Sequence, residues 1–180
     1  MVVIGIVGLI GSGKDTAAEY IAKKYNYLII SYRDVIAEIM QRIGLETNRE
    51  NMQRFAREAR DKHGEDVFAK KVLEKIKKSK NKKIIVKEMR TEGDLLTIRR
   101  NLGSFFVIEV FAEEKLRYER LKKRKRLGDP KNFEEFLIQQ KREEELGYTK
   151  SLEYADYCLE NNGSLKELYE KIDKLMRFFK

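Results

Sequence analysis

The sequence has one cysteine, one proline and no long uninterrupted apolar run among its 180 residues. The single cysteine, Cys158, excludes an intramolecular disulfide and a cysteine-based zinc cluster, which suits a reducing compartment. The apolar stretch over residues 1–10 is interrupted by glycine, lacks a basic segment before it and is too short to span a bilayer. We therefore expect a cytoplasmic protein with no membrane partner, in which Cys158 is a small core residue.

Repeats and linkers are also missing from the sequence. No stretch rich in proline, glycine or serine divides the chain, which predicts a single domain over residues 1–180. Short β-rich runs alternate with helical patterns, and this alternation predicts an α/β fold with parallel strands joined by crossover helices. The five runs lie at residues 2–7, 27–30, 83–86, 105–111 and 156–159.

Three helix boundaries can be predicted from capping residues. Asn48 is expected to begin a helix that Gly64 ends. Ser164, with Glu167 three residues later, forms the pattern of a capping box at the start of the last helix.

Positive charge is what the sequence has in excess. It contains 39 Lys and Arg against 30 Asp and Glu, a formal net charge of +9. This balance favours an anionic partner such as a phosphate ester, a nucleic acid or a membrane surface, and charge alone does not choose among them. The basic run at residues 122–126 keeps nucleic-acid binding as an alternative function.

A glycine-rich segment at residues 8–14 follows the first predicted strand and precedes a helical pattern, the setting of a phosphate-binding loop. Its backbone N–H groups and the helix N-terminus attract an anion, and its lysine adds charge for the β- and γ-phosphates of ATP. The residues predicted to bind ATP here are Gly8, Gly11, Ser12, Gly13 and Lys14. The usual motif continues with a hydroxyl residue that binds Mg²⁺, whereas here Asp15 follows and Thr16 comes next, so either is a candidate nucleotide and metal ligand.

Arg117, Arg120 and Arg124 recur at helical spacing, which places three guanidinium groups on one helix face. Such a face can neutralise a polyphosphate, and a mobile basic segment can also exclude water during phosphoryl transfer. We predict that Arg117 and Arg124 bind the nucleotide, that Arg120 is catalytic, and that residues 113–142 form a lid. A solvated basic helix is the alternative interpretation.

Two residues follow predicted strands where open α/β sheets bind ligands. Asp34 could orient or deprotonate an acceptor hydroxyl as a catalytic and substrate-binding residue, or it could be the N-cap of the helix after it. Arg90 is predicted to bind an acceptor phosphate, with a surface ion pair as the alternative.

The phosphate loop with its Lys-Asp-Thr ending, together with residues 31–34, 86–90 and 128–130, resembles P-loop nucleotide kinases. The resemblance is strongest to the dephospho-CoA kinase and deoxynucleoside monophosphate kinase group, including archaeal relatives. It implies a three-layer P-loop fold with a five-stranded parallel sheet in the order 2-3-1-4-5, a small helical lid and an adenine-side loop at Asn162. It also implies ATP-dependent, Mg²⁺-assisted phosphorylation of a small nucleotide-like acceptor, either dephospho-CoA or a (deoxy)nucleoside monophosphate.

One position departs from that family's pattern. Relatives carry an acidic residue at the end of the third strand, where this sequence has Lys87. Glu88 is the nearest acid, and strand alternation would turn its side chain to the opposite face. Either Asp15 and Asp34 compensate for the missing carboxylate in organising Mg²⁺, or the protein is a degenerate kinase that binds nucleotide and turns over poorly. The charge of +9 and the basic run at residues 122–126 keep a nucleotide-dependent nucleic-acid-binding or regulatory protein as the alternative to a kinase.

Overall fold

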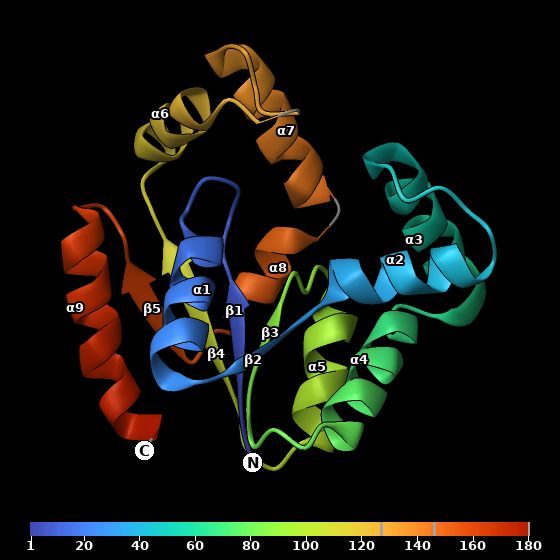
Figure 1. The fold of residues 1–180 in the computed structure, drawn as a ribbon. Coiled ribbons are helices and arrows are strands. Elements are labelled where there is room, and N and C mark those ends of the chain that lie inside the picture. The colour runs from blue at the N-terminus through green and yellow to red at the C-terminus, as the bar shows by residue number, and fades with distance from the viewer. Residues whose placement is uncertain (127, 146, 180) are drawn as a thin grey trace.

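A computed structural model describes residues 1–126, 128–145 and 147–179 (Figure 1). Five parallel strands form one sheet in the order β2-β3-β1-β4-β5, which confirms the predicted strand order. Two predicted strands begin one residue later than expected, so Tyr27 and Asp156 precede β2 and β5. The strands are β1 (Val2–Val7), β2 (Leu28–Ser31), β3 (Lys83–Lys87), β4 (Phe105–Phe111) and β5 (Tyr157–Glu160).

Helices cover both faces of the sheet, which completes the predicted three-layer architecture (Figure 1). α1 (Lys14–Tyr25) and α9 (Leu165–Leu175) pack on one face; α2 (Tyr32–Arg42), α3 (Arg49–His63), α4 (Val67–Lys78) and α5 (Glu92–Asn101) belong to the other. Strand alternation divides the core, because Val3 and Val7 enter the cluster with α4 and α5 while Ile4 and Ile6 enter the cluster with α1 and α9.

The remaining helices are α6 (Glu114–Arg124), α7 (Phe133–Glu145) and α8 (Tyr148–Leu152), with a short 3₁₀ helix η1 (Met176–Phe179) after α9. Figure 1 shows α6 and α7 above the loop between β1 and α1, at the carboxyl edge of the sheet. Both elements fall largely within the segment predicted as a lid.

The predicted helix boundaries are confirmed by hydrogen bonds. The Asn48 side chain accepts from the N–H of Asn51 at 2.9 Å and begins α3, which Gly64 ends. The Ser164 hydroxyl accepts from the N–H of Glu167 at 3.3 Å and begins α9. These side chains satisfy N–H groups that the first turn of a helix leaves without intrahelical partners.

The expectation that Cys158 lies in the core is wrong, because this residue is exposed. Its strand, β5, is at the edge of the sheet, and only Leu159 of that strand is buried, in the cluster with α9. Neighbouring side chains of a strand point to opposite faces, so burying Leu159 turns Cys158 outward.

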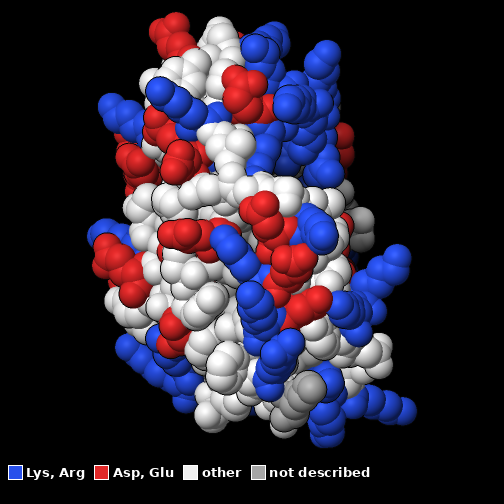
Figure 2. Space-filling view, turned by 90° about the vertical axis from the view of Figure 1, so that its left-hand side faces the viewer, with Lys and Arg blue, Asp and Glu red and all other residues white. Residues whose placement is uncertain are grey.

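Basic side chains gather at the end of the molecule formed by α6 and α7 (Figure 2). They include the exposed residues Lys122, Lys123, Lys125 and Arg126. Within the described segments, none of the helices combines the length and hydropathy that crossing a membrane requires.

Candidate functional site

The phosphate loop, residues 8–14, adopts a backbone conformation that requires glycine at positions 11 and 13, among others. Gly11 and Gly13 have φ angles of 79° and 94°, in the left-handed region that side chains disfavour. A Cβ atom on Gly11 would lie 2.7 Å from the carbonyl oxygen of Arg117, and one on Gly13 would lie 2.3 Å from the Asn161 amide. The glycines therefore let later segments approach the loop closely, and Gly13 leads directly into the N-terminus of α1.

Two of the predicted lid arginines contact the backbone of the phosphate loop. Arg117 is buried and donates to the carbonyl oxygen of Ile10 at 3.2 Å, while its other terminal nitrogen bonds Gln140 of α7 at 2.5 Å. Arg120 donates to the carbonyl oxygen of Ser12 at 3.3 Å. α6 thus packs against the phosphate loop, and Arg117 connects the loop with both α6 and α7.

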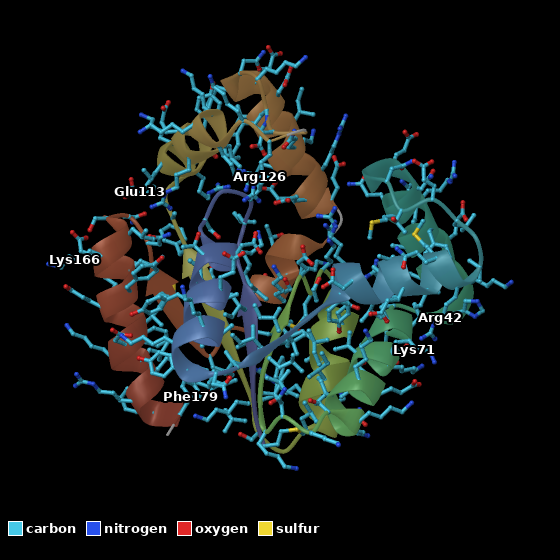
Figure 3. All side chains as sticks on the ribbon, viewed as in Figure 1. Arg42, Lys71, Glu113, Arg126, Lys166 and Phe179 are labelled. Carbon is cyan, nitrogen blue, oxygen red and sulfur yellow. The ribbon has the colours of Figure 1, made fainter. Side chains whose placement is uncertain are left out.

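The third arginine of this face has a different partner. Arg124 forms a two-point ion pair with Asp129, with Nε–Oδ2 and Nη2–Oδ1 distances of 3.0 and 2.5 Å. Asp129 also accepts from the N–H of Arg126, which lies between α6 and α7 (Figure 3). Arg124 is therefore held by the connection between the lid helices, although its charge still acts on Asp15 and lowers the pKa of that carboxyl.

Asn161 contacts the loop and was missed by sequence reasoning, which selected its neighbour. The buried Asn161 side chain donates to the carbonyl oxygen of Ser12 at 2.7 Å, and the backbone carbonyl oxygen of Asn161 accepts from Arg120 at 2.7 Å. Asn162 instead accepts from the N–H of Glu113, at the start of α6 (Figure 3). Two adjacent asparagines after a strand give no sequence signal for which one faces the loop.

The loop already holds an anionic oxygen. A Glu143 oxygen from α7 accepts from the N–H of Ile10 at 3.4 Å, a contact that the sequence did not predict. Burial lowers the pKa of Lys14, while the charges of Asp15, Glu143 and Glu88 oppose that decrease. A carboxylate from α7 thus lies where the loop amide and Lys14 can both act on it.

Asp15 and Lys87 form an ion pair across 72 residues of sequence. Lys87 Nζ lies 3.1 Å from Asp15 Oδ1. Burial alone would raise the pKa of Asp15, but the charges of Lys14 and Lys87 outweigh burial and the pKa is lowered. Burial alone would lower the pKa of Lys87, but the charge and hydrogen bond of Asp15 outweigh burial and that pKa is raised. Both groups are therefore charged at neutral pH.

These residues do not form the usual magnesium site. The Asp15 carboxylate is paired with an ammonium group, and the other candidate ligand, Thr16, is half-buried in the first turn of α1. In the described segments there is no cluster of three or more acidic, histidine or cysteine side chains suited to a metal ion.

Glu88 does not follow the expected strand alternation. β3 ends at Lys87, and Glu88 has a φ angle of 64°, so its side chain is no longer directed by the pleat of the strand. Its carboxylate accepts from the hydroxyl of Ser31 at the end of β2 and acts electrostatically on Lys14. Glu88 therefore stays at the phosphate-loop edge of the sheet.

Asp34 is exposed and lies at the third position of α2. The alternative in which Asp34 caps this helix is wrong, because Ser31 is the N-cap and its hydroxyl accepts from the Asp34 N–H at 3.3 Å. Asp34 lines a groove outside the edge strand β2, together with Glu38 and Lys75. The structure thus does not bring Asp34 against the phosphate loop.

The charge of Arg90 reaches the phosphate loop, since it adds to the effect of burial in lowering the pKa of Lys14. The Arg90 N–H donates to Asp94 Oδ2 at 3.1 Å. Asp94 is fully buried, forms a capping box with Thr91, and pairs with Arg60 of α3 at 3.0 Å. This buried ion pair ties the segment after β3 to α3.

The strand order and the phosphate loop define a P-loop nucleotide-binding domain with a kinase-like fold. The model of the AAA domain family matches residues 7–136. The chain is 35% identical over 179 residues to a UPF0200/UPF0201 protein of Archaeoglobus fulgidus, covering 98% of this chain and 55% of that protein. It is 31% identical over 174 residues to a UPF0200 protein of Hyperthermus butylicus, covering 97% and 92%. The chain belongs to the AAA domain family and to the UPF0200 proteins.

Solved kinase structures share the fold. A shikimate kinase from Bacteroides thetaiotaomicron superimposes with a TM-score of 0.61 at 17% identity, covering 99% of this chain and 98% of that one. A gluconokinase from Sinorhizobium meliloti gives a TM-score of 0.60 at 14% identity, covering 99% and 95%. These matches confirm the predicted P-loop kinase-like fold.

Proposed function

We propose that this protein is an ATP-dependent phosphotransferase that moves the γ-phosphoryl group to a small nucleotide-like acceptor. The observation that carries the proposal is the anion held at the phosphate loop. The Glu143 carboxylate accepts from the Ile10 N–H and lies within electrostatic reach of Lys14, as a phosphate oxygen of ATP would. A bound phosphate would replace this side chain of α7.

In this proposal Lys14 and the loop amides hold the phosphates, and Arg120 acts on charge that develops in the transition state. Arg117 positions α6 on the loop through Ile10, because all three of its guanidinium nitrogens already donate hydrogen bonds within the protein. Arg124 would exchange Asp129 for a phosphate oxygen when the lid, residues 113–142, closes. Closure would also exclude water from the phosphoryl group.

Arg90 and Asp34 are proposed to bind the acceptor, Arg90 through a phosphate and Asp34 through a hydroxyl group. Dephospho-CoA and a (deoxy)nucleoside monophosphate are the acceptors proposed, and both carry these two groups. Magnesium would enter with ATP and neutralise charge on its phosphates, with Asp15 and Thr16 as the protein groups that could contact it.

A phosphotransfer screen tests the proposal. Purified protein is incubated with ATP and, separately, with dephospho-CoA and each common nucleoside monophosphate, and phosphorylated acceptor is measured. We expect one acceptor class to be phosphorylated, and we expect Lys14→Ala to abolish transfer and weaken ATP binding by about 100-fold, since a charged contact to the phosphates is lost. Unchanged ATP affinity in Lys14→Ala would contradict the assignment of the loop.

The exposed basic run at residues 122–126 favours a second candidate, a nucleotide-dependent nucleic-acid-binding protein. Such a protein would bind DNA or RNA with an affinity that falls steeply with salt, because bound counterions are released. Tight, salt-sensitive binding together with no phosphotransfer to any acceptor would support this candidate over the kinase.

A further inference from the structure

The two departures from the usual phosphate-loop pattern meet in space. The loop has Asp15 where a metal-binding hydroxyl is usual, and β3 ends in Lys87 where a metal-organising carboxylate is usual. Each change alone would leave an unbalanced charge beside the loop. Together they form an ion pair of 3.1 Å, so a carboxylate and an ammonium group replace two oxygen ligands.

The pair is built into the sheet. Lys87 is aligned with Ile6 of β1, two residues before the phosphate loop begins, and with Ser31 of β2. Its side chain is only 20% exposed, and that of Asp15 is 42% exposed. A lysine anchored at a strand end and partly desolvated has less conformational entropy to lose on binding than a surface lysine.

We propose that Lys87 is a phosphate-binding residue, a built-in cation that contacts the triphosphate beside Lys14 and is held ready by Asp15 when no nucleotide is bound. The proposal rests on the proposed function, because it assumes that ATP occupies the loop. It assigns to Lys87 the charge neutralisation that a metal ion provides in a site with oxygen ligands.

The surrounding charges permit this role. The positive charges of Lys14 and Arg124 attract the Asp15 carboxylate, as Lys87 does. The negative charges of Glu88 and Glu19 attract the Lys87 ammonium group. Asp15 therefore keeps cationic neighbours if Lys87 turns toward a phosphate. A divalent ion would instead compete with Lys87 for Asp15. ATP affinity should therefore depend strongly on metal if Asp15 binds a metal ion, and only weakly if Lys87 contacts the phosphates.

ATP binding to the full chain, measured by calorimetry in MgCl₂ and in EDTA, tests the proposal without enzymatic turnover. If Lys87 supplies the cation, the wild-type dissociation constant should rise less than about tenfold when magnesium is removed. Lys87→Met should weaken binding in EDTA by at least about tenfold, the loss of one charge-assisted contact. Lys87→Arg, which keeps the charge, should retain most of the affinity.

The matched control is Lys82→Met, which removes the same charge from an exposed residue just before β3, at the opposite end of that strand. It should change ATP affinity less than about twofold. Asp15→Asn adds a second test, because removing the carboxylate that competes with phosphate for Lys87 should tighten ATP binding in EDTA.

Three outcomes would overturn the proposal. Wild-type binding that requires magnesium, with Lys87→Met unchanged in EDTA, would assign the site to a metal and leave the kinase proposal standing. Equal effects of Lys87→Met and Lys82→Met would show that Lys87 acts only through the net charge of the protein and does not contact the phosphates. No ATP binding by the wild type in either buffer would overturn both this proposal and the proposed function.

Discussion

Two parts of the carboxyl edge of the sheet are stabilised in different ways. The nucleotide end is the phosphate loop, which is proposed to bind ATP, and the acceptor end is formed by the segments after β2 and β3, which are proposed to bind the acceptor. At the nucleotide end, Arg117, Arg120 and Asn161 converge on backbone carbonyls of the phosphate loop. At the acceptor end, the buried pair of Arg60 and Asp94 supports the backbone. The nucleotide end is therefore preorganised by contacts to its backbone. At the acceptor end, the side chains of Asp34 and Arg90 are exposed, and the buried ion pair stabilises the backbone that carries Arg90.

The largest effect is expected on protein stability, from breaking the ion pair between Arg60 and Asp94. Arg60→Ala should lower the free energy of unfolding by about 3 kcal/mol, because it leaves the buried Asp94 carboxylate without its cationic partner. Urea denaturation measures the change. Arg57→Ala, at an exposed position of the same helix, is the control and should change stability by less than about 0.5 kcal/mol. Equal effects of the two substitutions would mean that the ion pair does not support the acceptor end.

The next effect separates a lid from a general basic surface. Arg120→Ala should lower kcat by about 100-fold, because its guanidinium would act on charge in the closed complex. Lys123→Ala, on the exposed side of α6, should lower kcat by less than about threefold. Steady-state kinetics with the acceptor found in the screen measures both. Similar losses in the two variants would contradict a specific role for Arg120.

A smaller effect tests the acceptor end directly. Asp34→Asn should lower kcat by about tenfold or more and leave ATP affinity nearly unchanged, since Asp34 lies away from the phosphate loop. Acceptor kinetics and ATP calorimetry together distinguish these effects. Because Ser31 caps α2, thermal stability should also change little. A fall in ATP affinity equal to the fall in kcat would place Asp34 at the nucleotide end instead.

The smallest effect sharpens the description of the nucleotide end. Glu143→Gln should raise ATP affinity by about threefold, because the neutral side chain competes less well with phosphate for the Ile10 N–H and the field of Lys14. Glu144→Gln is the matched control on the same helix and should leave affinity unchanged. Weaker ATP binding in Glu143→Gln would show that this carboxylate supports the nucleotide rather than occupying its place.

The two ends also differ in how well the sequence predicts them. The phosphate loop is a continuous motif whose flanking strand and helix are visible as local patterns, so residues 8–14 could be predicted with their setting. Asn161, Glu143 and Lys87 come from segments distant in the sequence from the phosphate loop, and no local pattern predicts the contacts that they make there. Asp34 was expected to be a possible cap because Asp is a common N-cap residue, but Ser31 is three residues earlier and takes that place.

By itself the sequence determined the alternation of strands and helices, the parallel sheet and the phosphate loop, because these depend on local periodicity, capping and glycine content. Only the tertiary structure decided that Asp15 pairs with Lys87, that Arg124 pairs with Asp129, and that Cys158 faces outward. Such pairings follow from which side chains the sheet order and helix packing bring within a few ångströms. Charge and hydrogen-bond geometry act over those distances in space, whatever the separation along the chain.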